Sequence, residues 1–580
     1  MKTKNFFSKL FVTMNIFVLL LSIFMLAGCS KASKVDTSKS QLHLLIFAGG
    51  DGIKWLENAK EIFEERYADV SLEEGKVGVQ VWIDDGKGGN YESTNCVDAL
   101  HLGENDICFT AINYPYAISK NTLMDITDLV KEKYDSVDFD GDGTPELVSI
   151  EDKMNSTNKN FFNFDGKYYG LPYMSYLDGI TYDIDLFEEK GFYILSNGNY
   201  STPDAFENHI YNGRGELSAG LDGIKGTYDD GLPSTWNEMR DLINHIRESG
   251  VIPFIWDNVN VYQRTNLFNA IWASYEGENN YNLNYSMDGT YVGTPITYNG
   301  EQFTEKEIHD YNGYLISSQN GKLAAITAIK DMTAYATTSS NPGTYYNSTN
   351  SHTDAQTRYL KSNTKYRTTG LNYPIAMIIE SSYWVNEAKQ TFTDMVDLLG
   401  EEYSSLNRRF GYMPIPSFQN MEDENIPNQI NTTLTLSANC PYSAFINNYS
   451  NNKEVAKEFF KFIYSNEILS MSTGITGNYR GVKTILSESD MKKMSFYQLQ
   501  CYDLLNNNVL VNRSTPGDTR FSTLNQSFMN GWYDTIIDPV QGKLPNLFDY
   551  FISNPNVSPK TLFDYYSNIN ESIWGIKEND

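Results

Sequence analysis

The sequence predicts an α/β protein built of two lobes. Apolar runs of strand length alternate with segments whose apolar residues recur at helical spacing, which is the pattern of α/β folds. At 580 residues, the chain is also longer than a single compact core usually holds, so two cores are expected.

The N-terminus has the form of a secretory leader with a lipobox. Three lysines precede an apolar run, Leu10–Met25, which ends in Leu26-Ala27-Gly28-Cys29. We therefore expect a signal peptide at residues 1–28, lipidation of Cys29, and a polar tether at 29–40. An uncleaved membrane anchor is the alternative, although the run is short for a membrane span. Either version places the rest of the chain outside the cell.

The folded body is expected to begin near Gln41 with a strand–loop–helix unit. His43–Phe47 reads as a buried strand, a glycine-rich loop follows, and apolar residues from Trp55 to Tyr67 recur at helical spacing. Trp55 lies on the apolar face of this helix, so we expect it in the core. Further strands are predicted at Val79–Ile83 and Asp106–Ala111.

Later segments carry clear helix signals. Thr235 and Glu238 form a capping box, and Gly250 follows a helix expected over Trp236–Glu248. A second amphipathic helix is predicted at Lys453–Tyr464. Residues 279–372 are rich in Asn, Thr, Ser, Tyr and Gly and show little periodicity, so they are predicted to form loops and short elements that elaborate one lobe.

Composition excludes some partners and favours others. Asp and Glu number 73 against 45 Lys and Arg, which argues against nucleic acid. Tyrosine is abundant at 41 residues, and its ring and hydroxyl suit a sugar-binding surface. General sequence composition explains the same count, so this observation alone does not decide.

No catalytic motif supports an enzyme. The sequence has no HExxH, GxSxG, Walker or GxGxxG motif in a suitable context. Beyond Cys29, four dispersed cysteines, Cys96, Cys108, Cys440 and Cys501, show no metal or redox spacing. They are interpreted as buried thiols, with disulfides as the alternative.

One acidic loop has the spacing of a calcium site. Asp138, Asp140 and Asp142 alternate along the chain before Thr144 and Glu146, and calcium prefers such oxygen ligands. Ser149 stands where an EF-hand has its closing glutamate, so a free-standing structural calcium loop is predicted, against the alternative of a solvated acidic turn. The loop at Leu221–Gly231 is a less regular second candidate.

Several separated segments resemble the extracellular solute-binding lipoproteins of ABC transporters, in the branch related to maltose-binding protein. The segments that carry this resemblance are Ile46–Tyr67, Asn105–Phe109, Gly166–Tyr173, Gly179–Asp183, Leu232–Met239, Ala376–Trp384, Phe410–Pro416 and Val455–Tyr464. Each motif alone is weak, but their order behind a lipobox is specific.

The resemblance implies a clamshell in which interlobe crossings act as a hinge. It implies an N-terminal lobe of residues 41–171 and 441–490 and a C-terminal lobe of 172–440 and 491–580. The ligand would lie between them. Carried over by position, the ligand-binding residues would be Gly50, Asp51, Asp106, Asn113, Tyr114, Tyr116, Tyr173, Tyr176, Trp256, Asp257, Tyr262, Glu380, Tyr383, Trp384, Arg520 and Trp532.

The function implied is that of a non-enzymatic, lipid-anchored monomer on the outer face of a bacterial membrane. It would capture a carbohydrate, most simply an oligosaccharide, and deliver it to a separate permease. A surface glycoside hydrolase or lyase and a binding lipoprotein for a non-sugar solute are the alternatives.

Overall fold

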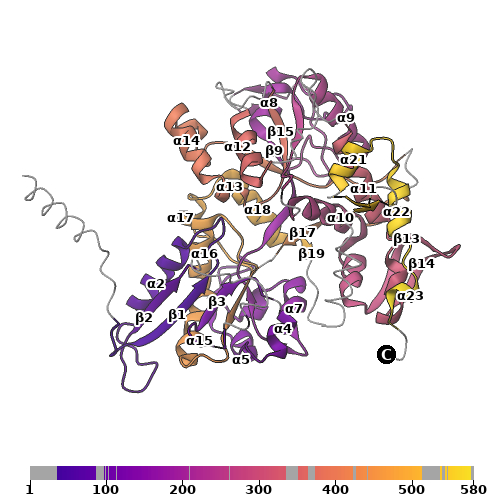
Figure 1. The fold of residues 1–580 in the computed structure, drawn as a ribbon. Helices are drawn as coiled ribbons and strands as arrows, with labels where there is room; N and C mark the ends of the chain where they lie inside the picture. Colours follow the sequence, from indigo (N-terminus) through magenta and orange to yellow (C-terminus); the bar gives the residue numbers. More distant parts are fainter. Residues whose placement is uncertain are drawn as a thin grey trace, which may run out of the picture.

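The computed structural model has the two-lobed α/β architecture that the sequence predicts (Figure 1). It describes residues 35–85, 97, 100–101, 103–112, 114–207, 209–213, 215–259, 262–334, 350–362, 373–421, 426–439, 442–511, 536–538, 542–544 and 547–576. Cys29, Cys96, Asn113, Cys440, Arg520 and Trp532 lie outside this part, as do the apolar run Leu10–Met25 and the side chain of Tyr262. No helix among the described residues combines the length and apolar character needed to cross a membrane.

The first lobe is built on a five-stranded sheet with the order β2-β1-β3-β18-β8. Strands β1, β2 and β3 are parallel, and β18 runs antiparallel to β3. Its main elements are β1 (Ser40–Ile46), α2 (Lys54–Arg66), β2 (Val79–Asp84), β3 (Ile107–Thr110), α4 (Tyr114–Ser119), α5 (Thr127–Lys131), α6 (Ile150–Lys153), α7 (Ser156–Phe162), β8 (Leu171–Pro172), β18 (Ser443–Ile446), α15 (Lys453–Ile463) and α16 (Asn466–Thr476). Two short hairpins, β4 (Asp135–Val137) with β5 (Glu146–Val148) and β6 (Asn163–Phe164) with β7 (Lys167–Tyr168), extend it.

The second lobe contains a six-stranded sheet with the order β12-β15-β9-β17-β19, in which β16 also pairs with β9. Its main elements are β9 (Tyr176–Asp183), α8 (Ile184–Lys190), α9 (Trp236–Glu248), β12 (Ile252–Ile255), α10 (Tyr262–Ser286), α11 (Asn320–Thr333), α12 (His352–Ser362), β15 (Ile375–Ser381), α13 (Trp384–Glu387), α14 (Lys389–Leu399), β16 (Phe410–Met413), β17 (Thr435–Asn439), α18 (Phe496–Asn507) and β19 (Val509–Val511). Helix α17 (Glu488–Met491) precedes α18, and a two-stranded hairpin, β10 (Phe206–Glu207) with β11 (Ile210–Tyr211), follows α8.

The chain passes between the lobes three times in the described residues. One passage joins β8 to β9, another joins β17 to β18, and the third leads from α16 towards α18. Ser175 and Tyr479, from the first and third passages, form an isolated β-bridge. These crossings bring segments far apart in sequence together at the hinge.

Several local predictions are confirmed. Helix α9 begins behind the capping box of Thr235 and Glu238 and ends before Gly250. Helix α15 buries the predicted apolar face, and Trp55 is only 3% exposed in the first-lobe core. Cys108 and Cys501 are buried free thiols.

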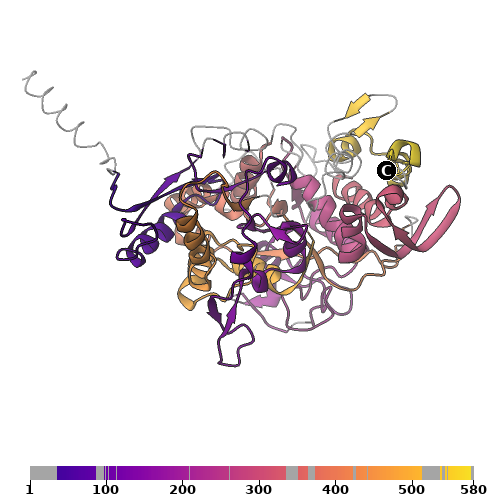
Figure 2. The same ribbon diagram turned by 90° about the horizontal axis from the view of Figure 1, so that it is seen from below.

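The prediction for residues 279–372 is wrong in part. This region contains the end of α10, the hairpin β13 (Gly289–Tyr298) with β14 (Glu301–Ile308), the 14-residue helix α11 and helix α12. Twelve residues of α11 are buried, so the helix has no polar face that would reveal its period. Figure 2 shows the hairpin projecting from the second lobe, on the side away from the first-lobe sheet.

The C-terminal segments also belong to the second lobe. Helices α21 (Leu547–Ser553) and α22 (Pro559–Tyr566) pack against α11, and α23 (Glu571–Trp574) packs beside the 3₁₀ turn η2 (Asp310–Ile316). The remaining short elements are η1 (Pro203–Ala205), η3 (Glu401–Tyr403) and the hairpin β20 (Ile536–Asp538) with β21 (Gly542–Leu544).

Candidate functional site

The candidate site lies where the carboxyl ends of the parallel strands of the two lobes approach each other. The loop after β1 carries Gly50 and Asp51, Asp257 follows β12, and Glu380 lies near the carboxyl end of β15. In open α/β sheets, ligands bind outside the carboxyl ends of the strands. The chain topology therefore brings these predicted residues to one region.

Asp51 joins the two lobes. Its Oδ1 accepts a hydrogen bond from Asn386 Nδ2 of the second lobe at 3.3 Å and another from Asn478 Nδ2 in the third crossing. Its Oδ2 lies 3.6 Å from Arg480 Nη1, and both side chains are at most 3% exposed. Burial raises the pKa of Asp51, and the charge of Arg480 only partly opposes that rise.

Arg480 is held by several acceptors besides Asp51. Its guanidinium donates to the carbonyl of Tyr173 at 3.2 Å and to Thr476 Oγ1 at 2.9 Å. It also lies 4.6 Å from the centroid of the Trp55 ring, a cation–π arrangement. Arg480 therefore fixes the third crossing against the first lobe.

A second contact between the lobes is made by Gly50 and Glu387. A Cβ atom on Gly50 would lie only 2.6 Å from Glu387 Cγ, so the close approach requires glycine. The Glu387 carboxylate accepts a hydrogen bond from Gln356 Nε2 at 2.8 Å, and the same amide reaches Glu380 at 3.3 Å. Burial raises the pKa of Glu387, and the nearby charges of Asp51 and Asp257 raise it further.

Aromatic rings line the same region. The rings of Tyr176 and Tyr383 meet at 4.6 Å between centroids, and Phe47 stacks on Tyr442 at 5.3 Å. Tyr173 lies 6.1 Å from Tyr442 and donates a long hydrogen bond to the carbonyl of Phe47. Tyr383, Tyr442 and Phe47 are half-buried, so part of each side chain remains accessible beside the carboxylates.

The structure corrects the expected position of Asp106. This residue precedes β3 at its amino end, away from the loop that carries Asp51. It is 2% exposed and accepts hydrogen bonds from the His43 amide, Ser450 and Asn452. Asp106 therefore joins strand β1 to the loop before α15 at the amino end of β3, opposite to the end that carries Asp51.

Three predicted aromatic residues are packed in the cores. Tyr114 is buried against Phe162, Trp256 is fully buried beside Phe548, and Trp384 is fully buried. Trp384 packs among Tyr359, Phe392, Phe410 and Tyr497. These three side chains stabilise the lobes, whereas half-buried Tyr116 lies 5.3 Å below the ammonium of Lys120.

The acidic loop of Asp138, Asp140 and Asp142 is preshaped. Carboxylate oxygens of the three residues lie within 4.8 Å of one another. Amides of Gly141 and Gly143 donate to Asp138 at 2.8 and 2.9 Å, and the Thr144 amide donates to Asp142 at 2.7 Å. Glu146 is exposed in β5 and is not part of this group.

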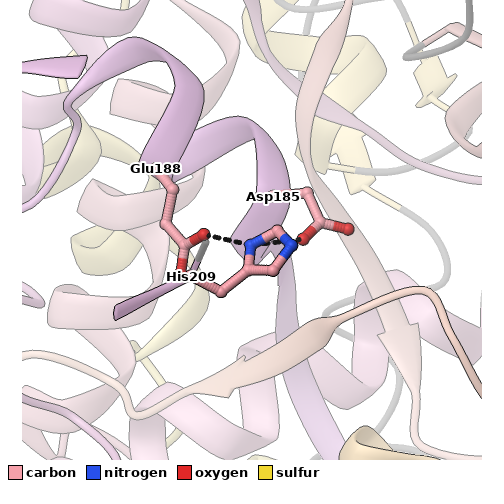
Figure 3. Close-up of side chains that lie close together, drawn as sticks. All are labelled: Asp185, Glu188 and His209. Carbon is pink, nitrogen blue, oxygen red and sulfur yellow. Dashed lines mark hydrogen bonds and ion pairs between the residues drawn. The ribbon is translucent and has the colours of Figure 1, made fainter. Parts of the chain in front are cut away.

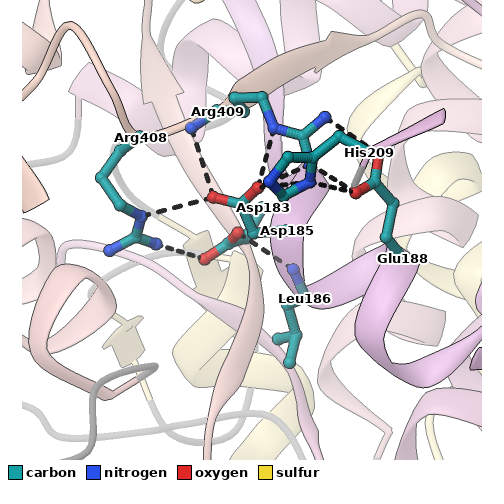
Figure 4. Close-up of polar contacts among 7 residues, drawn as sticks. All are labelled: Asp183, Asp185, Leu186, Glu188, His209, Arg408 and Arg409. Carbon is teal, nitrogen blue, oxygen red and sulfur yellow. Dashed lines mark hydrogen bonds and ion pairs between the residues drawn. The ribbon is translucent and has the colours of Figure 1, made fainter. Parts of the chain in front are cut away.

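A second group of possible metal ligands is already neutralised. Asp185 and Glu188 project from α8 towards His209, which lies in the turn between β10 and β11 (Figure 3). The guanidinium of Arg409 bonds both carboxylates, with Nε 2.8 Å from Asp185 and Nη1 2.9 Å from Glu188 (Figure 4). The Arg409 guanidinium therefore occupies the position that a metal ion would need, and we interpret Asp185, Glu188 and His209 as a structural cluster.

The sequence reasoning missed Gln356, Asn386, Glu387 and Arg480. Gln356 bonds Glu380 and Glu387 across 24 and 31 residues, and Asn386 reaches Asp51 across 335 residues, so local spacing carries no signal for these pairings. The sequence gives one weak indication for Gln356: it lies four residues after His352 in α12, so the two polar side chains share one face of that helix.

Comparisons with known proteins bear on the fold and the family of the chain. No curated protein sequence matches the chain. The structure of the galactopyranose receptor AcbH covers 93% of this chain and 100% of its own, with a TM-score of 0.51 and 11% identity. Ligand-free RafE from Streptococcus pneumoniae has the same coverage, TM-score and identity, and a chitin oligosaccharide binding protein matches with a TM-score of 0.51 and 14% identity over 93% and 100% of the two chains.

These structural similarities show the fold of the chain. A family model shows to which protein family the chain belongs. The model described as bacterial extracellular solute-binding protein matches residues 55–468, which is more than half of the 580 residues. The matched range runs from helix α2 to helix α16 and contains Tyr383, Asn386 and Glu387, whereas Gly50, Asp51 and Arg480 lie just outside it. The chain therefore belongs to the bacterial extracellular solute-binding protein family.

Proposed function

We propose that this chain is the carbohydrate-binding component of an ABC importer and delivers its ligand to a membrane permease. The observation that carries the proposal is the meeting of half-buried aromatic side chains with buried carboxylates between the lobes. Tyr383 and Tyr442 offer apolar ring faces, while Asp51 and Glu387 offer hydrogen-bond acceptors. Sugars present both an apolar face and hydroxyl donors, so they match this combination.

Closure of the lobes around the ligand would provide the signal to the permease. Asp51 and Gly50 of the first lobe contact Asn386 and Glu387 of the second. A ligand that touches both lobes stabilises the closed form by its differential affinity for that form. The similar solved proteins include receptors described for β-D-galactopyranose and for chitin oligosaccharide, which supports a sugar as the ligand.

A ligand screen tests this proposal against its two alternatives. Purified protein is mixed with mono- and oligosaccharides and, separately, with short peptides, and thermal unfolding is followed. A bound sugar at a hundredfold excess over its Kd should add about 2.7 kcal/mol of apparent stability. Stabilisation by peptides alone would overturn the sugar assignment. Release of shortened products from an oligosaccharide would show a hydrolase or lyase instead.

Tyr383 provides the sharpest variant for the sugar site. We expect Tyr383→Ala to weaken sugar binding at least tenfold, because the half-buried ring next to Tyr176 loses its stacking face. Calorimetry with the sugar found in the screen measures the loss. Tyr565→Ala is the control, since this exposed tyrosine lies on α22, far along the C-terminal segment. Equal affinity in Tyr383→Ala and the parent protein would place the sugar elsewhere.

Anchoring at the outer face of the membrane is the second part of the proposal. The lipobox ending in Cys29 supports it, and a diacylglyceryl group would hold the monomer there. Cys29→Ala should appear in the soluble fraction after a high-salt wash. Complete retention of a processed variant in the membrane fraction would contradict lipid anchoring.

A structural calcium ion at the Asp138 loop is the third part. The support is the group of three carboxylates, whose oxygens lie within 4.8 Å of one another and whose loop amides already order the side chains. Calcium prefers such oxygen ligands. Millimolar calcium should raise the Tm of chelator-treated protein and leave Asp140→Ala unchanged. An identical response of both proteins would reduce the loop to an acidic turn.

A further inference from the structure

A polar cavity lies in the second lobe, and its lining contains none of the residues proposed for the sugar site. Its volume is about 420 Å³, within the range of small-molecule sites. It is lined by Tyr275, Glu276, Gly277, Glu278, Asn279, Asn280, Thr290, Val292, Gly293, Thr294, Ile430, Asn431, Thr433, Thr435 and Val509. All of these residues are described, and the set contains two carboxylates and no lysine, arginine or histidine.

A break in helix α10 forms part of the wall of this cavity. Gly277 has φ 78° and ψ 172° inside the helix, a backbone conformation that favours glycine. The carbonyl of Ser274, next to the break, accepts hydrogen bonds from Gln429 Nε2 at 2.9 Å and from Asn431 Nδ2 at 3.0 Å. The protein therefore holds the broken helix open with dedicated side chains.

Glu276 is the buried charged group of the cavity. The residue is 6% exposed, and its Oε1 accepts a hydrogen bond from the Gly321 amide at 2.8 Å. Within the described residues, its Oε2 has no hydrogen-bond partner. This oxygen also does not belong to the fully buried side-chain atoms without a partner, so part of its surface is accessible. The second carboxylate oxygen is therefore the acceptor that remains for an occupant of the cavity.

The ammonium of Lys322 does not bond to Glu276 Oε2 in the described residues. It is 1% exposed and absent from the cavity lining. Its ammonium donates to the Ser317 carbonyl at 3.0 Å and lies 4.6 Å from the centroid of the Trp272 ring. Burial raises the pKa of Glu276 to about 7, although the hydrogen bond from Gly321 and the charge of Lys322 oppose that rise.

We propose that this cavity binds a small organic cation, a solute with a protonated primary amine, with its ammonium on Glu276 Oε2. An ammonium group supplies both the hydrogen-bond donor that Oε2 accepts and the positive charge that the lining does not contain. Tyr275 and Val292 supply apolar contact for the carbon skeleton. A metal ion fits less well, because no metal-ligand group found among the described residues includes Glu276 or Glu278.

The cavity borders helix α7 of the first lobe. Ser156 Oγ of α7 donates to Glu278 Oε1 at 2.8 Å, and Thr157 of the same helix bonds the Leu510 carbonyl beside Val509. The proposal is independent of the sugar site, since none of the cavity residues belongs to that site.

Calorimetry with matched pairs of probes tests the proposal. The pairs are putrescine with 1,4-butanediol and glucosamine with glucose, at low ionic strength and neutral pH. At least one amine should bind tenfold or more tightly than its neutral counterpart, and Glu276→Gln should remove that preference. Glu305→Gln, at an exposed site of the neighbouring hairpin, should keep it.

Each other outcome overturns the proposal. Equal binding of amine and alcohol, or no binding of either, removes the cation assignment. Amine binding that survives in Glu276→Gln places the cation elsewhere, and a thermal shift with calcium alone that Glu276→Gln removes shows a metal site instead. Circular dichroism of Glu276→Gln establishes that the variant is folded. Should it unfold, Thr294→Phe, which fills the cavity, must abolish amine binding for the proposal to stand.

Discussion

Two buried carboxylate–arginine pairs in this protein differ in how well their charges are neutralised. Asp183 and Arg408, inside the second lobe, are 2.6 Å apart and at most 6% exposed (Figure 4). Asp51 and Arg480, between the lobes, are equally buried but 3.6 Å apart. The first pair forms a direct charged hydrogen bond, whereas the second leaves the arginine bonded mainly to neutral oxygens.

The surroundings of the two pairs show the same difference. At α8, Arg408 and Arg409 face Asp183, Asp185 and Glu188 of the helix and its N-cap. Between the lobes, the pKa of Glu387 is raised by burial and by neighbouring carboxylates. A neutralised cluster stabilises one lobe at all times. A cluster with unbalanced charge costs stability until a ligand or a conformational change compensates it, which is typical of a binding site.

The largest expected effect is on the pair inside the second lobe. Asp183→Asn should lower the free energy of unfolding by about 3–5 kcal/mol, because Arg408 would remain buried without its direct partner. Asp183 also caps α8 through the Leu186 amide, and asparagine retains that cap. Urea denaturation of variant and parent protein measures the difference. A loss below about 1 kcal/mol would show that Asp185, 3.7 Å from Arg408, neutralises the arginine alone.

A smaller effect is expected for the pair between the lobes. Asp51→Asn should cost only about 1–2 kcal/mol, since Arg480 keeps Thr476, the Tyr173 carbonyl and the Trp55 ring as partners. Scattering should instead show a more open average shape, because the bond to Asn386 joins the lobes. If Asp51→Asn destabilises the protein as much as Asp183→Asn, the two pairs have the same structural role and the comparison fails.

The sequence predicts the elements whose signals are local. The capping box of Thr235 and Glu238 gives the start of α9, Gly250 gives its end, and the one-sided apolar pattern gives α15. Helix α11 is not predicted, because burial on nearly all sides removes the polar face from its pattern. Fold class follows from the alternation of such local signals, so a few missed helices do not alter it.

The candidate site is less predictable than the fold. Gly50, Asp51 and Tyr383 can be placed near strand ends from the sequence, but whether a side chain points to a core or to the site depends on packing. Tyr383 and Trp384 are adjacent, yet Trp384 is fully buried in the second-lobe core while Tyr383 packs against Tyr176. The partners of Asp51 lie in α13 of the second lobe and in the third crossing, and no local motif places these segments next to Asp51.

The smallest expected effect concerns the pH dependence of Glu387. Its folded-state pKa lies above the ordinary glutamate value, because burial and the charges of Asp51 and Asp257 disfavour ionisation. The folded state therefore binds the proton more tightly than the unfolded state. Its contribution to stability is complete below about pH 4.3 and is lost as the pH rises through the folded-state value.

Glu387→Gln should remove this dependence. The variant and the parent protein should be equally stable near pH 4, and without ligand the variant should be more stable by about 0.5–1 kcal/mol near pH 8. Urea denaturation at both pH values measures the change, with Glu401→Gln as the control because Glu401 is exposed on the same lobe. A variant that is less stable than the parent at pH 8 would mean that the Glu387 charge is compensated, as the carboxylate charges of α8 are by Arg408 and Arg409. The contrast between the two clusters would then be one of position alone.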